Sequence, residues 1–280
     1  MKAMIISILF ILLAPSQQSF AEEKSRYYET YKVTTLIPPY KYEAMIYEPK
    51  IEKIKAILII SHTLSASDSI EGADAQYFSK NGFVVIVPFL FETELNKLFP
   101  DTEKLDADFL RPIASVNNFI DIAETKLKLR PNLPIFAMGA SQGAITTITL
   151  TASITRIRAA WSAVGGGDLP HIFARSDVST LVKFRNNHMS ILQINNLDEY
   201  ENYLRDHLTN DPTIFCKDIK VPFHQTIATH DTAVPTRTQE LLAKECPPHE
   251  IQRLNLSHTG GSMTVVRDQE KIKEFFEAEL

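Results

Sequence analysis

The stretch from Leu133 to Ala152 constrains the fold of this chain more than any other. An apolar run of strand length, 134–138, leads into Gly139-Ala140-Ser141-Gln142-Gly143, and an apolar-rich stretch without Gly or Pro follows. The pattern predicts a buried strand that turns sharply into a helix. Glycines two residues either side of Ser141 remove the Cβ atoms that would clash where strand and helix cross. We therefore expect a nucleophile elbow that exposes the Ser141 hydroxyl, with a plain Gly-Ser turn as the alternative.

Apolar runs and amphipathic segments alternate along the rest of the chain. Predicted strands cover 27–36, 42–47, 55–61, 83–87, 134–138, 157–164, 221–229 and 250–256. Predicted helices cover 70–80, 108–129, the stretch after Ser141, 176–186, 197–208, 236–245 and 265–278. Prolines separate the first two strands, which are typical of an edge hairpin. The alternation predicts an α/β fold with a mostly parallel central sheet and helices on both faces.

The region 168–218 interrupts this alternation. It holds two or three helical segments and no strand, so we expect a small helical cap inserted after the sixth strand. Loops at the carboxyl end of a strand usually shape a pocket. Several large apolar side chains in it either line an apolar pocket or pack on the sheet: Phe173, Leu181, Phe184, Met189, Leu192, Ile194, Tyr200 and Tyr203.

The first 21 residues have the pattern of a signal peptide. Lys2 is followed by the apolar run Met4 to Ala14 and by small residues that end at Ala21. Eleven apolar residues fall short of the ~20 that span a bilayer, which argues against the alternative of a membrane anchor. We expect cleavage after Ala21, export to the periplasm or the medium, and one domain over 22–280 with no stable membrane span.

Charge and cysteine content narrow the partners and the compartment. The formal net charge of the whole chain is −5, without long blocks of like charge, so nucleic acid is not an expected partner. Cys216 lies before the strand predicted over 221–229, and Cys246 closes the helix that follows it. A helix packed antiparallel on its strand returns to the start of that strand, so the two sulfurs can meet. A Cys216–Cys246 disulfide is one reading, and two separate buried thiols are the other.

Ser141 needs a base and an acid to act as a nucleophile, because a neutral serine hydroxyl is a poor one. His258 follows the last predicted strand, at the sheet edge where Ser141 should emerge, in a polar loop. Asp231 follows the strand predicted over 221–229, and Asp168, after the preceding strand, is the second choice. The chain order Ser141, Asp231, His258 is the nucleophile, acid and base order of one particular fold.

A developing oxyanion needs hydrogen-bond donors. The amide of Gln142 is one candidate, because it lies at the N-terminus of the predicted helix. The second is a backbone amide in the loop after the strand predicted over 55–61, with Leu64 preferred to Thr63. His62, in the same loop, is expected to be a structural hydrogen-bonding residue instead of a second base.

Together these motifs resemble the α/β-hydrolase superfamily, in particular its branch of dienelactone hydrolases and small serine esterases. The elbow matches directly, and His62-Thr63-Leu64 stands where these enzymes usually carry a His-Gly oxyanion loop. The segments 78–88, 211–222 and 231–235 are also similar to the family pattern. Three positions depart from the family pattern: Thr63 and Ala228 stand where glycine is usual, and Phe89 stands where aspartate is common. These departures leave the three candidate catalytic residues intact and put the substrate class in doubt.

The resemblance implies a serine hydrolase that cleaves a carboxylic ester or related acyl bond of a small molecule through an acyl-enzyme, and the N-terminal segment implies that it is exported. No metal or organic cofactor is expected, and the histidines show no paired ligand spacing. Two alternatives stay open. One is a peptidase or acyltransferase on the same site, and the other is a catalytically silent binding protein with this fold.

Overall fold

One eight-stranded sheet forms the centre of the molecule. The computed structural model describes residues 25–38, 40–64, 69–89, 95, 97, 100–246 and 250–280. The strands are β1 (Tyr28–Ile37), β2 (Tyr40–Pro49), β3 (Ala56–Ser61), β4 (Phe83–Phe89), β5 (Ile135–Ala140), β6 (Ile157–Ala163), β7 (Phe223–Ala228) and β8 (Glu250–Leu254). Their spatial order is β1-β2-β4-β3-β5-β6-β7-β8. β1 pairs with β2, and β2 with β4, in antiparallel fashion. The five other strand pairs are parallel, so the predicted mostly parallel sheet is confirmed.

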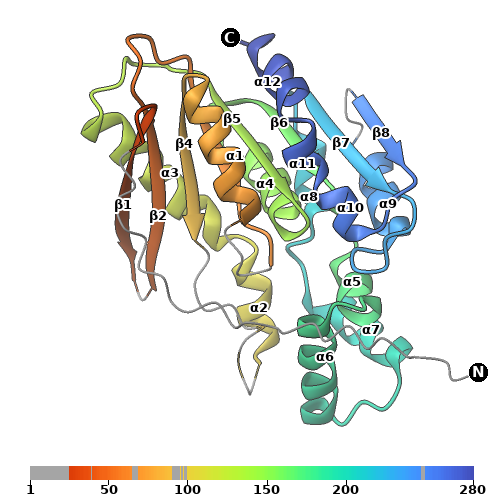
Figure 1. Ribbon diagram of the computed structural model, residues 1–280. Coiled ribbons are helices and arrows are strands. Elements are labelled where there is room, and N and C mark those ends of the chain that lie inside the picture. The colour runs from red at the N-terminus through yellow and green to blue at the C-terminus, as the bar shows by residue number, and fades with distance from the viewer. Residues whose placement is uncertain are drawn as a thin grey trace, which may run out of the picture.

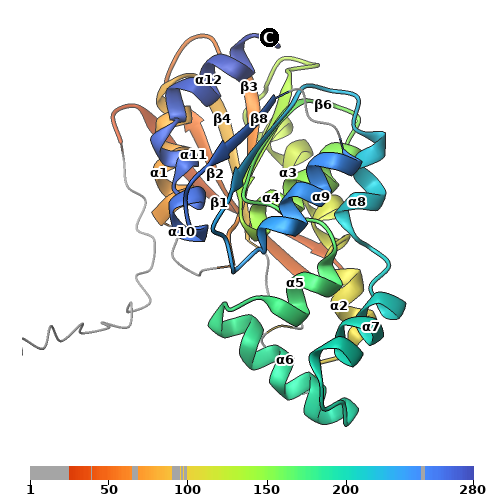
Figure 2. The same cartoon turned by 90° about the vertical axis from the view of Figure 1, so that its right-hand side faces the viewer.

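Helices cover both faces of the sheet (Figures 1 and 2). They are α1 (Ser69–Lys80), α2 (Thr102–Asp108), α3 (Arg111–Lys126), α4 (Gln142–Ser153), α5 (Leu169–Arg175), α6 (Ser179–Leu192), α7 (Leu197–His207), α8 (Pro212–Phe215), a 3₁₀ turn η2 (Cys216–Asp218), α9 (Thr236–Glu245), α10 (His258–Ser262), α11 (Thr264–Arg267) and α12 (Gln269–Glu277). Figure 2 shows α3, α4 and α9 on one face and α1, α11 and α12 on the other.

Side chains of the central strands alternate between two apolar cores. Ile57 and Ile59 of β3 face α3, whereas Leu58 and Ile60 face α1 and the C-terminal helices. Successive strand residues point to opposite faces, and both faces are covered, so every residue of β3 and of β5 is buried. This double burial explains the continuous apolar runs in the sequence. The parallel pairing of the strands places the carboxyl ends of β3, β5 and β7 at one edge of the sheet.

Helices α5, α6 and α7 lie beyond that edge, together with α2 (Figure 1). Helices α5, α6 and α7 belong to the helix-only insertion after β6 that the sequence predicts, whereas α2 precedes β5. All four helices contribute to one apolar cluster, which includes Leu105, Leu169 and Tyr200. The sheet and the insertion thus meet at the carboxyl ends of the strands, where ligands of open α/β sheets bind.

Two predicted helices are divided in the structure. The segment expected as one helix over 108–129 consists of α2 and α3, separated at Phe109–Leu110, because Pro112 in the first turn of α3 has no N–H for an earlier carbonyl. The helix expected over 265–278 is divided into α11 and α12. His258, expected in a loop, is the first residue of the short helix α10.

The structure joins Cys216 and Cys246 in a disulfide, with their Cα atoms 5.2 Å apart. Cys216 lies in η2 and Cys246 ends α9, and both side chains are buried with Phe223 and Leu242. The bridge therefore connects the start of β7 with the end of the helix that follows it.

The N-terminal segment 1–21, read as a signal peptide, lies outside the described residues, as does the start of the proposed mature chain at 22. Among the residues that the structure describes, no helix is both long enough and apolar enough to cross a membrane.

Candidate active site

Ser141 lies at a strained turn between β5 and α4. Its φ of 56° and ψ of −124° are rare for a residue with a Cβ atom. A Cβ atom on Gly139 would lie 2.5 Å from the Gly143 backbone, and one on Gly143 would lie 2.2 Å from the Ser61 carbonyl oxygen. Both glycines are therefore required by the crossing of strand and helix. The turn leaves the Ser141 side chain on the wall of a cavity.

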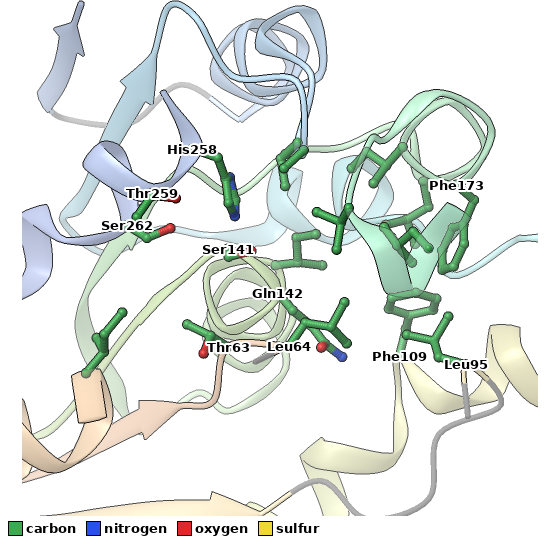
Figure 3. Close-up of a pocket in the computed structure, with 18 residues that line it drawn as sticks. Thr63, Leu64, Leu95, Phe109, Ser141, Gln142, Phe173, His258, Thr259 and Ser262 are labelled. Atoms are coloured by element: carbon green, nitrogen blue, oxygen red, sulfur yellow. The ribbon is translucent and has the colours of Figure 1, made fainter. Parts of the chain in front are cut away.

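His258 and Asp231 lie beside this turn and are hydrogen bonded to each other. Nδ1 of His258 is 2.8 Å from Oδ2 of Asp231. Ser141 and His258 line the same cavity, and Figure 3 shows the His258 imidazole pointing toward Ser141. The Asp231 carboxylate fixes the tautomer and orientation of the imidazole, and the second ring nitrogen is left for a serine proton.

The Asp231 carboxylate is buried and held by the chain that follows it. Oδ1 accepts hydrogen bonds from the amides of Ala233 and Val234, each at 2.9 Å. Oδ2 accepts a hydrogen bond from Nε2 of Gln239 at 2.8 Å, and the same oxygen is the partner of His258 Nδ1. Gln239 is fully buried, and its other bonds go to the Val234 carbonyl and the Ala228 amide. Gln239 is not predictable from the sequence, because an uncharged side chain in the first turns of a helix belongs to no recognisable motif.

Gln239→Glu should destabilise the protein in a pH-dependent way. The substitution is isosteric but puts a second carboxyl group 2.8 Å from Asp231 Oδ2, where the amide now donates. Two buried carboxylates at this distance cannot both ionise cheaply, so the native state holds a proton that the unfolded state releases as the pH rises. We expect a loss of about 2–3 kcal/mol in the free energy of unfolding at pH 8 and a smaller loss at pH 5, measured by urea titration.

Gln193→Glu is the matched control, because Gln193 is exposed at the end of α6 and the charge change is the same. It should change the free energy of unfolding by less than about 0.5 kcal/mol at either pH. Equal effects of the two substitutions would contradict a specific contact between Gln239 and Asp231.

The two expected oxyanion donors in the β3–α1 loop differ in the structure. The Thr63 amide donates to Oε1 of the buried Glu71 at 2.7 Å, so it is directed to a carboxylate instead of to the cavity. Leu64 lines the cavity with Ser141, and Gln142 opens α4, so its amide belongs to the first turn of the helix. The engaged Thr63 amide therefore leaves Leu64 and Gln142 as the candidate pair of donors.

His62 is buried in the same loop. Its ring lies against Phe89, with centroids 5.0 Å apart, and its Nδ1 is 3.7 Å from Glu71 Oε1. These contacts are those of a residue that holds the loop together.

The cavity next to Ser141 has a volume of about 400 Å³ (Figure 3). Among its described lining residues none is Asp, Glu, Lys or Arg, and most are aliphatic or aromatic. Leu64 and Leu95 lie on the β3–α1 and β4–α2 sides, and Phe109 follows α2. Helix α5 and the start of α6 supply most of the far wall: Leu169, Ile172, Phe173, Val178 and Leu181.

The sequence predicts that eight large side chains of the insertion either line a pocket or pack on the sheet. Of these eight, only Phe173 and Leu181 line this cavity. Phe184 and Tyr200 are buried in the cluster between the inserted helices, and the other four pack against that cluster. Packing between the helices is thus the more common role.

Asp168, the second choice for the acid, belongs to a different cluster. Its carboxylate pairs with Arg205 at 2.9 Å and with Arg237 at 3.4 Å. Ligand atoms of Asp168, His171 and Glu201 lie within 4.8 Å of one another. Glu201 is also paired with an arginine, Arg175, so arginines already neutralise both carboxylates of this group.

Comparisons with known proteins show the fold. No protein-family model and no curated protein sequence matches the chain. Among solved structures, the uncomplexed acylaminoacyl peptidase of Pyrococcus horikoshii matches with a TM-score of 0.65 at 15% identity, over 92% of this chain and 42% of that one. This chain therefore spans less than half the length of that peptidase.

Two esterase structures match over most of both chains. Acetyl xylan esterase 1 of Thermoanaerobacterium sp. gives a TM-score of 0.64 at 15% identity, covering 89% of this chain and 86% of that one. An esterase of Pyrococcus furiosus gives 0.62 at 14% identity, covering 90% and 93%. At these identities the likeness shows the fold alone. It is the α/β-hydrolase fold, and the fold class predicted from the sequence is confirmed.

Proposed function

We propose that this chain is a serine hydrolase that cleaves carboxylic esters through a covalent acyl-enzyme. The observation that carries the proposal is the 2.8 Å hydrogen bond between His258 and Asp231, beside a cavity that Ser141 and His258 line together. An alcohol, an imidazole and a buried carboxylate in this order are the groups that acyl transfer requires.

In the proposed reaction Ser141 Oγ attacks the ester carbonyl carbon while His258 Nε2 takes the serine proton. The amides of Gln142 and Leu64 stabilise the negative oxygen of the tetrahedral intermediate. His258 then gives the proton to the leaving alcohol, and the acyl group stays on Ser141. Water, deprotonated by His258, attacks the acyl-enzyme by the same steps and releases the acid.

The cavity supports an uncharged, apolar group on one side of the scissile bond. Burial of a CH₂ group contributes about 0.8 kcal/mol, whereas a buried charge without a partner costs several kcal/mol. The described lining offers apolar contacts and no cation to pair with a carboxylate. Esters with an apolar chain are thus the favoured substrates over acidic ones.

Export of the protein is part of the proposal. It is supported by the charged start, apolar run and small residues of the segment 1–21. A disulfide between Cys216 and Cys246 fits an oxidising compartment, where such bonds persist.

Alkyl fluorophosphonates test the proposal directly, because they phosphonylate a serine that is activated by a base much faster than an ordinary serine. We expect stoichiometric labelling of the wild-type protein at neutral pH, on the peptide that carries Ser141, measured by mass spectrometry. A probe with an alkyl tail should label faster than a methyl analogue, since its tail gains burial in the apolar cavity.

Labelling of another serine, such as Ser262 in the same cavity, would show that the nucleophile is not Ser141 of the elbow. A fully folded protein with no labelling would contradict the hydrolase proposal and favour a silent binding protein. Labelling together with turnover of anilides but not of esters would favour a peptidase.

A further inference from the structure

Two buried carboxylates lie behind the loop between β3 and α1. Glu71 is 1% exposed in the first turn of α1, and Asp74 is fully buried one turn later. Burial raises the pKa of the Asp74 carboxyl to about 7; the hydrogen bond from Gln269 opposes this rise and the nearby Glu71 adds to it. Burying two carboxylates on one helix is costly and is weak evidence for a stability role, so the contacts of each have to be considered separately.

Within the part of the chain that the structure describes, Glu71 contacts the loop between β3 and α1. Its Oε1 accepts the Thr63 amide at 2.7 Å and lies 3.7 Å from His62 Nδ1. Among the described residues its Oε2 has no hydrogen-bond partner. A hydrogen bond from a backbone amide to a carboxylate is short and about twice as strong as a neutral one. Glu71 therefore fixes the orientation of the peptide between His62 and Thr63.

The other side of the loop is held by the elbow helix. The Ser61 carbonyl lies so close to Gly143 that a Cβ atom there would be 2.2 Å from its oxygen. Ser61 Oγ also accepts a hydrogen bond from Thr147 Oγ1 of α4 at 3.3 Å. The start of the loop is thus fixed against the helix of Ser141, and its next peptide is fixed by Glu71, which leaves little freedom for the Leu64 amide.

We propose that Glu71 is a positioning residue for oxyanion stabilisation. By holding the Thr63 amide it aims the following amide, that of Leu64, at the oxygen of the reacting carbonyl. The inference rests on the proposed function and adds to it a residue that touches neither substrate nor His258. Geometry of this kind matters because an oxyanion donor acts only within a short distance of the developing charge.

Glu71→Met tests the inference, because methionine fills the space but cannot accept the Thr63 amide. We expect kcat to fall about tenfold to hundredfold with KM within threefold of the wild type. Glu71→Gln keeps an acceptor oxygen and should stay within about threefold of the wild type. Glu71→Ala is a second variant without an acceptor, and it should behave as the methionine variant does.

Inhibitors separate positioning from general damage. An alkyl trifluoromethyl ketone forms a tetrahedral adduct with an oxyanion, whereas an alcohol with the same alkyl chain only fills the cavity. In Glu71→Met the inhibition constant of the ketone should rise in step with the loss of kcat, and that of the alcohol should not change. Asp74 is a buried carboxylate of the same helix whose hydrogen bond among the described residues goes to Gln269 and not to His62 or Thr63, so Asp74→Asn should leave both constants unchanged.

Unchanged kcat in Glu71→Met and in Glu71→Ala would overturn the inference, and so would equal weakening of both inhibitors. Loss of activity in Glu71→Gln equal to that in Glu71→Met would also overturn it. Failure of the proposed function looks different: the wild-type protein itself would then form no adduct with the ketone and take no fluorophosphonate label.

Discussion

Ser141→Ala is expected to lower kcat for ester hydrolysis by at least about 10⁴-fold, because no other described group at the elbow can carry the acyl chain. The substitution keeps the Cβ atom, so the strained φ of 56° persists and the backbone strain at this turn is unchanged. The free energy of unfolding should stay within about 1 kcal/mol of the wild type. Initial rates with an alkyl aryl ester and a urea titration measure the two quantities.

Ser153→Ala is the matched control, since Ser153 is exposed at the far end of the same helix, α4. It should leave kcat unchanged. His258→Ala should lose activity on the same scale as Ser141→Ala, and the double variant should lose no more, because the two groups act as one unit. Residual activity of Ser141→Ala above a tenth of the wild type would falsify the assignment of the nucleophile.

Replacing both Cys216 and Cys246 with serine is expected to produce the largest loss of stability. The bridge closes a loop with a sequence separation of 30. Chain-entropy arguments for a loop of this length give a loss of about 3.5 kcal/mol in the free energy of unfolding. Both sulfurs also leave an apolar cluster with Phe223 and Leu242, and the hydroxyls that replace them are poorly accommodated there. The midpoint temperature of thermal unfolding should fall by roughly 7–14 °C.

A reducing agent provides the comparison within the wild type. Thermal unfolding of the reduced wild type should approach that of the double serine variant, and the variant should not respond to the reductant. If the oxidised wild type and the double variant unfold at the same temperature, the bridge contributes no stability. The kcat for ester hydrolysis should be the same in both, because the disulfide lies at the end of the sheet away from His258.

The fold was predictable because its strongest signals are local. The double burial of β3 and β5 requires continuous apolar runs, and the crossing of β5 and α4 requires Gly139 and Gly143. The chain order of Ser141, Asp231 and His258 then selects residues at strand ends, and the structure brings Asp231 and His258 into contact. Each of these signals depends on a few neighbouring residues and on the alternation of strands with helices.

The supporting residues were not predictable, because their roles arise from contacts between distant segments. Gln239 reaches back to Asp231 from α9, and Glu71 reaches back from α1 to the loop before it. Neither has a sequence pattern that separates it from an ordinary helix residue. The preference for Leu64 over Thr63 has a physical reason only once the Thr63 amide is seen to be engaged.

The far wall of the cavity and the three candidate catalytic residues come from different parts of the chain. Most of the far wall comes from a single contiguous stretch, 169–181, whereas Ser141, Asp231 and His258 are supplied by the segments that directly follow β5, β7 and β8. Exchange of that stretch alone would change the shape of the cavity and leave these three side chains in place. Under the proposed function, selectivity for the bound chain could thus change while reactivity stays constant.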